Sequence, residues 1–375
     1  MQPGGPPGKN NMKVLLINSV CGIGSTGKIV GALAEEFTSQ GHQAVIAYGR
    51  DGTVPERYRC YAHRIGSDLG VKVSAVRTRL LDDHGFANES ATRKFLKWAE
   101  SYDPDLIWLH NLHGYYIHVG LLFDWIKSRP HMQVKWTLHD CWAFTGHCAH
   151  FLAAGCDRWK TGCHDCPEKG NYPASRLRDN SRKNYIWKKD AFTGVKNMSL
   201  IVPSRWLADL AKRSFLGEYP VEVRYTTINT DIFRPTPGDF REKYGLKDRK
   251  ILLGVAGVWT ERKGYRDFLK LRDTLDESWA MVMVGVTEAQ RRELPQGILG
   301  ILRTESPREL AEIYTAAEVF FNPTYEDTYP LVNLEAESCG TRVITYDTGG
   351  CAETIQRPDS LAIPAGNLNL VKTLL

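Results

Sequence analysis

The sequence between residues 317 and 353 combines carboxylates with the start of a helix. A short apolar run precedes Glu326 and Asp327, and Pro330 then opens a segment that carries Glu335. Proline suits a first helical position because its missing N–H is no loss there. The pattern therefore predicts a strand, a loop with two carboxylates and a helix, in that order.

These residue types suit a nucleotide. Loops that leave the carboxyl ends of parallel strands line the ligand crevice of an open sheet, which places Asp327 and Glu335 near that edge. A carboxylate can accept hydrogen bonds from two neighbouring hydroxyls, such as those of a ribose. The backbone N–H groups and the positive dipole end at a helix start attract an anion. We therefore predict a nucleotide site with Glu335 on the ribose.

A second pair of charged residues could hold phosphates. Arg262 and Lys263 lie between a predicted strand at 250–258 and an amphipathic helix that follows them. Two cations beside the N–H groups of a helix start form a diphosphate site.

Residues 322–353 resemble the donor-binding signature of the retaining, family-4-type glycosyltransferases, which have the GT-B fold. The matching elements are Glu335-Ala336, Cys339-Gly340 and Gly349-Gly350-Cys351-Ala352-Glu353. The first carboxylate of the signature falls on Asp327, where the family has Glu, and Glu326 stands beside it. Either residue is a candidate for that role. The resemblance also implies that Gly349 and Gly350 belong to the donor site.

The resemblance implies an α/β protein with two Rossmann-like, doubly wound parallel-sheet domains facing a cleft. Residues 12–230 would form the N-terminal, acceptor-side domain and residues 239–375 the nucleotide-sugar-binding domain, with 231–238 as the linker. We expect the second domain to be truncated or to end early, since only about twenty residues follow Ile355. Residues 1–11 are expected to be a disordered tail or a cloning remnant.

A glycine-rich segment, CGIGSTG, follows the first predicted strand. Gly22 to Lys28 fits the spacing of a phosphate-binding P-loop, but Ile29 stands where that loop needs a hydroxyl for magnesium. The spacing is not that of a dinucleotide fingerprint either. By resemblance, Gly24 and Gly27 lie near the donor phosphate or the acceptor. The alternative is a turn that needs small residues.

His139 and Asp140 end another predicted strand, where ligands bind in such sheets. In the resembled family a histidine at this position faces the donor sugar. The alternative is a neutral histidine that is bonded only to its neighbours. His110 and His113 could line the same cleft.

Five of the nine cysteines lie in a predicted insert at 141–166. Its last two end in C-x-x-C, a spacing that lets two thiolates bind one tetrahedral zinc. The predicted structural zinc ligands are Cys148, Cys156, Cys163 and Cys166. Reduced core cysteines or a disulfide are the alternatives. A nucleic-acid zinc finger is disfavoured because the insert lies inside an α/β domain and no basic recognition helix accompanies it.

The net charge of +5 fits anionic substrates or an anionic membrane and does not require nucleic acid. The basic, aromatic stretch 173–192 is either a solvated helix face or a surface for a membrane or a lipid-diphosphate acceptor. The longest apolar runs have the length of strands, and the opening residues lack the apolar region of a signal peptide. We expect a cytoplasmic protein, at the inner face of the membrane.

The favoured hypothesis is an enzyme, a retaining glycosyltransferase that uses a UDP-, GDP- or ADP-sugar and a glycan or lipid-linked hydroxyl acceptor. Its expected setting is the synthesis of bacterial surface polysaccharide or lipid-linked glycan. His139, Asp327 and Glu335 are the predicted catalytic residues, and the resemblance implies no catalytic metal. The alternative is a non-catalytic nucleotide- or glycan-binding protein on a degenerate scaffold, because Val258 replaces an Arg of the family. A zinc-dependent adaptor has only the cysteines in its favour.

Overall fold

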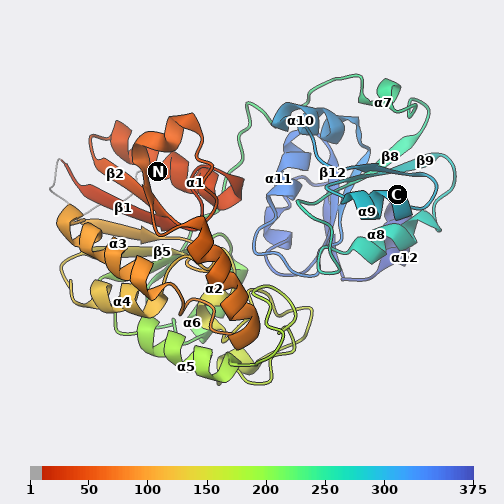
Figure 1. Ribbon diagram of the computed structural model, residues 1–375. Coiled ribbons are helices and arrows are strands. Elements are labelled where there is room, and N and C mark those ends of the chain that lie inside the picture. The colour runs from red at the N-terminus through yellow and green to blue at the C-terminus, as the bar shows by residue number, and fades with distance from the viewer. Residues whose placement is uncertain (1–10) are drawn as a thin grey trace. The chain divides into compact units, whose positions relative to one another are not determined.

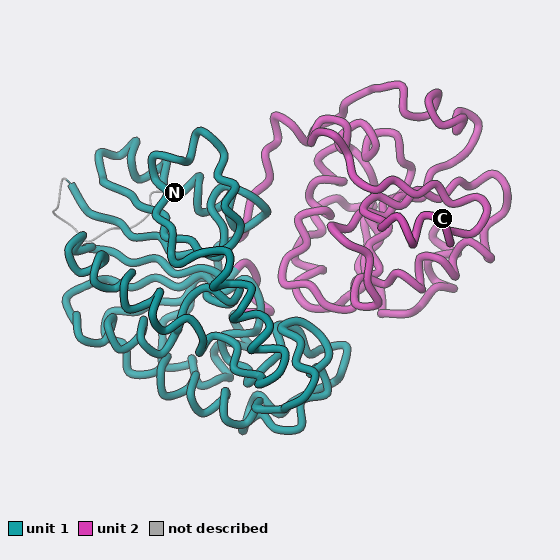
Figure 2. The backbone as a smooth tube through the Cα atoms, viewed as in Figure 1, with its two compact units in different colours: residues 1–202, 208–224 teal, residues 203–207, 225–375 magenta. Residues whose placement is uncertain are grey.

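The computed structural model describes residues 11–375 and divides into two compact units (Figure 2). Unit 1 ends at Arg224, and unit 2 comprises Tyr225–Leu375 together with the short segment Pro203–Leu207. The predicted tail 1–11 lies, apart from its last residue, outside the described residues. The predicted linker 231–238 lies in unit 2, where Phe233 packs into the core with 9% of its surface exposed.

Unit 1 is built on a parallel sheet of seven strands in the order β3-β2-β1-β4-β5-β6-β7 (Figure 1). The strands are β1 (Lys13–Asn18), β2 (Gln43–Tyr48), β3 (Ala62–Arg64), β4 (Leu106–Leu109), β5 (Gln133–Thr137), β6 (Met198–Val202) and β7 (Val221–Val223). The helices in this part of the chain are α1 (Gly24–Ser39), α2 (Asp68–Leu81), α3 (Glu89–Tyr102), α4 (Val119–Lys127), α5 (Ser181–Phe192) and α6 (Arg205–Arg213), with 3-10 turns at Glu56–Tyr61, Trp142–Phe144 and Arg158–Lys160.

The central strands β1 and β4 of this sheet are buried on both faces. In β1, Val14 and Leu16 pack with α1 residues such as Val30 and Phe37. The alternate residue Leu15 is equally buried, with no exposed surface. A parallel sheet covered on both faces needs continuous apolar strands, and this explains the run KVLLIN.

Unit 2 is built on a parallel sheet of six strands in the order β10-β9-β8-β11-β12-β13. The strands are β8 (Lys250–Val255), β9 (Trp279–Val284), β10 (Ile298–Ile301), β11 (Val319–Asn322), β12 (Arg342–Tyr346) and β13 (Leu361–Ile363). The helices are α7 (Phe240–Lys243), α8 (Tyr265–Arg272), α9 (Glu288–Glu293), α10 (Pro307–Ala316), α11 (Leu331–Ser338) and α12 (Leu368–Leu374), with a 3-10 turn at Ala352–Thr354.

A buried polar chain holds α11 on this sheet. Asn322, the last residue of β11, donates to the side chain of Asn333 at 2.9 Å, and Asn333 donates to Thr354 at 2.8 Å. All three residues are buried. Because buried polar groups are costly when they lack partners, this chain fixes the direction in which α11 leaves the strand.

Both sheets have the strand order of a doubly wound fold, so the predicted fold class is confirmed. The order reverses between β1 and β4 in unit 1 and between β8 and β11 in unit 2. In open sheets of this kind, ligands bind beyond the carboxyl ends of the strands at such a reversal. The loops that follow these four strands are therefore the places to look for a site.

One helix begins earlier than its sequence predicts. Periodicity places the start of the first helix at Lys28, but α1 begins at Gly24. The low helix propensity of glycine explains the difference. At Gly27 close packing requires the small residue, because a Cβ there would lie 3.1 Å from the backbone nitrogen of Gly22.

Candidate functional site

In unit 2, the loops that follow β8 and β11 meet at the reversal of strand order. The Nζ of Lys263 lies 2.5 Å from the Oδ2 of Asp327, and the two side chains are 22% and 20% exposed. Behind this ion pair, the N–H of Tyr325 donates to the carbonyl of Arg262 at 2.8 Å. The predicted cation and the predicted carboxylate therefore belong to one site.

The close approach of these loops depends on Gly264, which immediately precedes α8. Its φ of +74° lies in the left-handed region, and a Cβ there would come within 2.1 Å of the carbonyl oxygen of Pro323. Only glycine combines this backbone conformation with this contact. Lys263 therefore supplies the positive charge, and Gly264 allows the close backbone approach that positions it.

Arg262 supports the site from behind. Its Nη1 donates to the carbonyl oxygen of Glu326 at 2.5 Å, so part of the guanidinium braces the carboxylate loop. Glu326 is fully buried, whereas Asp327 stands beside Lys263. Of the two carboxylates that the sequence leaves open, the structure brings Asp327 to the cation.

Glu335 lies half-buried on α11, the helix that follows the carboxylate loop. Its Oε2 accepts from the hydroxyl of Tyr314 at 3.1 Å. Burial, and then the nearby Glu335 carboxylate, raise the pKa of Tyr314 well above its ordinary value. Tyr314 therefore remains a hydrogen-bond donor at neutral pH and orients the carboxylate.

Gly349 and Gly350 pack against the backbone of the carboxylate loop. A Cβ at Gly349 would lie 2.1 Å from the carbonyl oxygen of Asp327, and one at Gly350 would lie 2.0 Å from that of Thr328. The N–H of Gly350 also donates to the carbonyl of Asp327 at 2.9 Å. The two glycines thus hold Asp327 in place.

Glu353, the last residue of this motif, caps a helix start within unit 2. Its carboxylate accepts from the N–H groups of Arg205 and Trp206, each at 2.8 Å, and from the hydroxyl of Tyr225 at 3.1 Å. A carboxylate at a helix start is stabilised by the N–H groups there. These contacts give Glu353 a structural role.

In unit 1, the loops that follow β1 and β4 also meet. The side-chain oxygen of Asn18 accepts from the N–H of Asn111 at 3.3 Å, and the hydroxyl of Thr26 lies 3.5 Å from the amide nitrogens of both. Gly24, with a φ of +63°, has open space where a Cβ would stand. Gly24 and Gly27 therefore belong to the edge of the sheet at which ligands bind.

His139 follows β5 and pairs with His110. The Nε2 of His139 lies 3.2 Å from the Nδ1 of His110, and the rings stack with centroids 5.5 Å apart. Burial lowers the pKa of His139 to about 4 and that of His110 well below its ordinary value. Both rings are neutral at pH 7, so one donates a hydrogen bond to the other.

A chain of three side chains lies beside this pair, and sequence reasoning did not predict it. The Nε2 of His113 lies 2.8 Å from a carboxylate oxygen of Asp140, and its Nδ1 lies 3.0 Å from the hydroxyl of Tyr172. Burial acts to raise the pKa of Asp140, but His113 lowers it well below its ordinary value. Asp140 therefore accepts from His113, which accepts in turn from Tyr172. The histidine was visible in the sequence, but no local pattern connects Tyr172 to it.

The cysteine insert gathers its predicted zinc ligands without arranging them as a metal site. One small cavity is lined by Cys148, Cys156, Cys163 and Cys166. The thiols of Cys148 and Cys166 are hydrogen-bonded, and Cys163 accepts from the N–H of Gly146 at 3.1 Å. Within residues 11–375, no group of three or more His, Cys, Asp or Glu side chains is positioned to hold a metal ion. The zinc site stays a prediction.

Comparisons with known proteins relate this chain to glycosyl transferases. Residues 238–367 match the model of the group 1 glycosyl transferases. The Escherichia coli (strain K12) protein WcaC, named as a glycosyl transferase of colanic acid biosynthesis, is 26% identical over 364 residues, which cover 92% of this chain and 86% of WcaC. Residues 238–367 of this chain therefore carry a group 1 glycosyl transferase domain. A D-inositol 3-phosphate glycosyltransferase of Rhodococcus erythropolis is 32% identical to this chain over 277 residues, which cover 68% of this chain and 58% of that enzyme.

Solved structures show the fold of this chain. Sucrose-phosphate synthase from Thermosynechococcus elongatus superimposes with a TM-score of 0.69 at 18% identity, covering 97% of this chain and 88% of that one. The Anabaena protein Alr3699/HepE, solved in complex with UDP-glucose, gives a TM-score of 0.62 at 13% identity, with 97% and 88% covered. These likenesses confirm the predicted GT-B fold.

Proposed function

We propose that this glycosyl transferase moves a sugar from a nucleotide-sugar to a hydroxyl of a glycan or lipid-linked acceptor, with retention of anomeric configuration as in the family-4-type enzymes. The observation that carries the proposal is the ion pair between Lys263 and Asp327 at the reversal of strand order. It joins a phosphate-binding cation to a hydroxyl-binding carboxylate in one place.

Lys263 would hold the diphosphate. A diphosphate carries more negative charge than one carboxylate, so the donor would draw the ammonium away from Asp327. As the bond between sugar and phosphate breaks, negative charge grows on the leaving diphosphate, and Lys263 and the start of α11 would stabilise it. Arg262 keeps the carboxylate loop in position through the carbonyl of Glu326.

The carboxylates would hold the two ends of the donor. Once Lys263 turns to the phosphates, Asp327 accepts from hydroxyls of the donor sugar, and Glu335 accepts from the ribose hydroxyls. No covalent nucleophile is assigned to the reaction. The acceptor oxygen attacks the anomeric carbon on the face that the phosphate leaves, and a departing phosphate oxygen takes the acceptor's proton.

For unit 1 we propose binding of sugar hydroxyls. Neutral His139 and the chain of Asp140, His113 and Tyr172 supply both hydrogen-bond acceptors and donors at the carboxyl ends of the strands. Hydrogen-bonding groups of this kind suit the hydroxyls of a sugar. Gly24 leaves room for a ligand to approach the backbone beside it, and Gly27 lets the start of α1 pack closely on this loop.

Related proteins support the donor class and the setting. The structures of Anabaena HepE contain UDP and UDP-glucose, which makes UDP the first nucleotide to test, before GDP and ADP. The name of WcaC refers to colanic acid biosynthesis, which supports a role in a bacterial surface polysaccharide. We propose that the enzyme acts in the cytoplasm at the inner face of the membrane, where exposed cations such as Arg176 and Arg178 would face anionic lipid.

Turnover of a panel of UDP-, GDP- and ADP-sugars tests this proposal. The full chain should release a nucleoside diphosphate from at least one class of donor, and Lys263→Ala should lower the rate by tenfold or more, about 1.4 kcal/mol or more. Lys270→Ala, which removes an exposed lysine from the same helix region, is the matched control and should turn over like the wild type. Saturable binding without any turnover would instead support a binding protein on a degenerate transferase scaffold.

A further inference from the structure

One helix of unit 1 exposes its large apolar side chains. On α2, Leu69, Val73, Val76 and Leu80 are 71%, 59%, 55% and 43% exposed. Their spacing of four, three and four residues places them in one line along the helix, which we call the α2 stripe. A surface helix of a soluble domain normally turns such a line toward the core.

The packing of α2 is the reverse of that rule. The residues that α2 buries are Ser74 and Thr78. Small polar side chains thus face the domain and large apolar ones face outward. Leaving four such side chains in water forgoes the stabilisation that their burial would provide. An exposed apolar line of this length marks an interaction surface.

Exposed cations lie on α2 itself and on a segment that packs against its C-terminal end. The segment 176–183 lies against the end of α2, because the N–H of Arg176 donates to the carbonyl of Arg79 at 2.7 Å and the side chain of Asn180 donates to that of Leu81 at 2.5 Å. Exposed cations in α2 and this segment, which we call the cationic rim, are Lys72, Arg77, Arg79, Arg176, Arg178, Arg182 and Lys183.

The carboxylates exposed in the same two segments already have partners. Asp68 forms an ion pair with Arg64, and Asp179 accepts from Ser181 and from the N–H of Cys166. With seven cations and only these two carboxylates, the two segments carry a net positive charge. A positive patch attracts an anionic partner and steers its approach.

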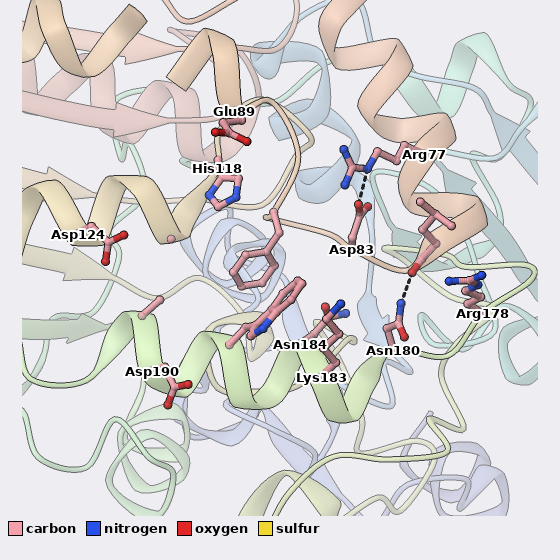
Figure 3. A pocket seen from close by; sticks show the side chains of 15 residues that line it. Arg77, Asp83, Glu89, His118, Asp124, Arg178, Asn180, Lys183, Asn184 and Asp190 are labelled. Carbon is pink, nitrogen blue, oxygen red and sulfur yellow. Dashed lines mark hydrogen bonds and ion pairs between the residues drawn. The ribbon is translucent and has the colours of Figure 1, made fainter. Parts of the chain in front are cut away.

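A hollow of about 580 Å³ adjoins the rim (Figure 3). Arg77 forms one side, where it is paired with Asp83, and Arg178 and Lys183 stand on the side of α5. Trp187, 38% exposed, also lines it and packs edge-on against Phe86 with ring centroids 4.9 Å apart. Cations beside an exposed tryptophan are the residue types that favour the interface between lipid headgroups and acyl chains.

We propose that the α2 stripe and the cationic rim dock unit 1 on a lipid bilayer that contains anionic lipids. The stripe enters the interface between headgroups and chains while the rim contacts the phosphates. Within residues 11–375 no helix is long and apolar enough to cross a membrane, so this contact is peripheral. A second copy of the chain fits less well, because a symmetric contact would set one cationic rim against another.

This inference rests on the proposed function in one respect: it names the surface that would bring the enzyme to a lipid-linked acceptor. Its test needs neither nucleotide nor acceptor. Failure of the docking surface would therefore leave donor turnover unchanged, and failure of turnover would leave vesicle binding unchanged.

Co-sedimentation of the full chain with vesicles tests the proposal. The wild type should bind vesicles of phosphatidylcholine with phosphatidylglycerol, bind at least about tenfold less tightly without the anionic lipid, and lose affinity as salt is raised. A variant with Val73→Ser and Val76→Ser, and one with Arg178→Glu and Lys183→Glu, should each bind at least tenfold less tightly. Circular dichroism checks that both variants fold.

Matched controls distinguish binding through this surface from non-specific binding to vesicles. Leu361→Ser removes an apolar side chain of unit 2 that is 40% exposed, and a variant with Lys94→Glu and Lys97→Glu reverses two exposed charges on α3. Both should bind anionic vesicles like the wild type. Absence of wild-type binding, equal losses in the controls, or a stripe variant that abolishes a dimer in sedimentation velocity and leaves vesicle binding intact would each overturn the proposal.

Discussion

At the scale of single residues, Lys263 is the group that must change partners. It is paired with Asp327 in the structure, and both side chains are about one-fifth exposed. Partly exposed ion pairs of this kind contribute about 1 kcal/mol or less to stability. The pair is therefore weak enough for an arriving diphosphate to replace the carboxylate.

Asp327→Asn should separate the two halves of donor recognition. Without the competing carboxylate, Lys263 should bind a nucleoside diphosphate as tightly as in the wild type or more tightly. Turnover of the nucleotide-sugar should fall by about tenfold or more, because a charged acceptor of sugar hydroxyls is lost. Calorimetry for the nucleotide and a rate assay for the sugar measure the two effects. A parallel loss of nucleotide affinity would contradict the assignment.

Glu335 should discriminate between ribose and dideoxyribose. The wild type should prefer a nucleoside diphosphate over its 2′,3′-dideoxy analogue by about tenfold or more, because only the former offers two hydroxyls to a carboxylate. Glu335→Gln should lose most of that preference and keep its hydrogen bond with Tyr314. Titration of both ligands into both proteins gives a double-mutant cycle. An undiminished preference in the variant would remove Glu335 from the ribose site.

His139 should remain neutral well below its ordinary pKa of 6.5, because burial lowers its pKa to about 4. Between these values the unfolded chain binds a proton that the folded chain does not. The stabilisation from neutral His139 is thus complete above pH 6.5 and is lost as the pH falls toward 4, by up to about 1.4 kcal/mol per unit. Histidine NMR, assigned with His139→Gln, should show no titration above pH 5. A midpoint near 6.5 would contradict this.

At the scale of elements, the site depends on short strands that end in loops held by glycine. Gly264 lets the loop after β8 approach Pro323. Gly350 lets the turn after β12 pack against Thr328. Buried bonds from Asn322 through Asn333 then fix α11. Backbone packing therefore determines the positions of the charged side chains Lys263, Asp327 and Glu335.

Gly350→Ala should show this dependence. A Cβ there would lie 2.0 Å from the carbonyl oxygen of Thr328, so the carboxylate loop must move. We expect a loss of roughly 1–3 kcal/mol in the free energy of unfolding, together with weaker binding of the nucleotide-sugar. Gly170→Ala, which has open space around its Cβ, is the control. Wild-type stability and donor affinity in Gly350→Ala would show that the loop does not need this contact.

The cysteine insert yields an element-scale prediction of its own. Metal analysis of protein purified under reducing conditions should find about one zinc per chain if Cys148, Cys156, Cys163 and Cys166 act as four thiolate ligands. Cys163→Ser should lower that content, and Cys60→Ser, which changes an exposed cysteine outside the insert, should not. If the thiols are reactive and no zinc is found, the zinc prediction is wrong and the four residues are reduced core cysteines.

At the scale of the whole molecule, local patterns predicted much of the fold. The apolar runs and the glycine and proline positions predicted parallel strands with helices between them, because those signals lie within a few residues. They also predicted the strand, loop and helix around Asp327 and Glu335. The predicted start of α1, at Lys28, was wrong by four residues, because glycines in a first helical turn have the sequence pattern of a loop.

Contacts between distant residues could not be predicted in the same way. The use of Arg262 as a brace for the carbonyl of Glu326 joins residues 64 positions apart. The bond from Tyr172 to His113 joins residues 59 positions apart. The outward direction of the α2 stripe was also hidden, because periodicity alone assigns an apolar face to the core. Each of these depends on how whole elements pack.

Retention of configuration is a property of the complete reaction. Early in the hydrolysis of a donor with an α-linked sugar, NMR should detect the α anomer of the released sugar before it equilibrates. This outcome is expected because the acceptor, here water, attacks on the face that the phosphate leaves. Initial release of the β anomer would show an inverting reaction.

Calorimetric titration of the full chain with UDP, GDP and ADP tests the central claim most directly, namely that unit 2 binds a nucleoside diphosphate through Lys263 and Glu335. We expect one of the three to bind saturably with one site per chain, and Lys263→Ala and Glu335→Ala each to weaken it by about tenfold or more. Failure of all three nucleotides to bind, or unchanged affinity in both variants, would contradict the claim.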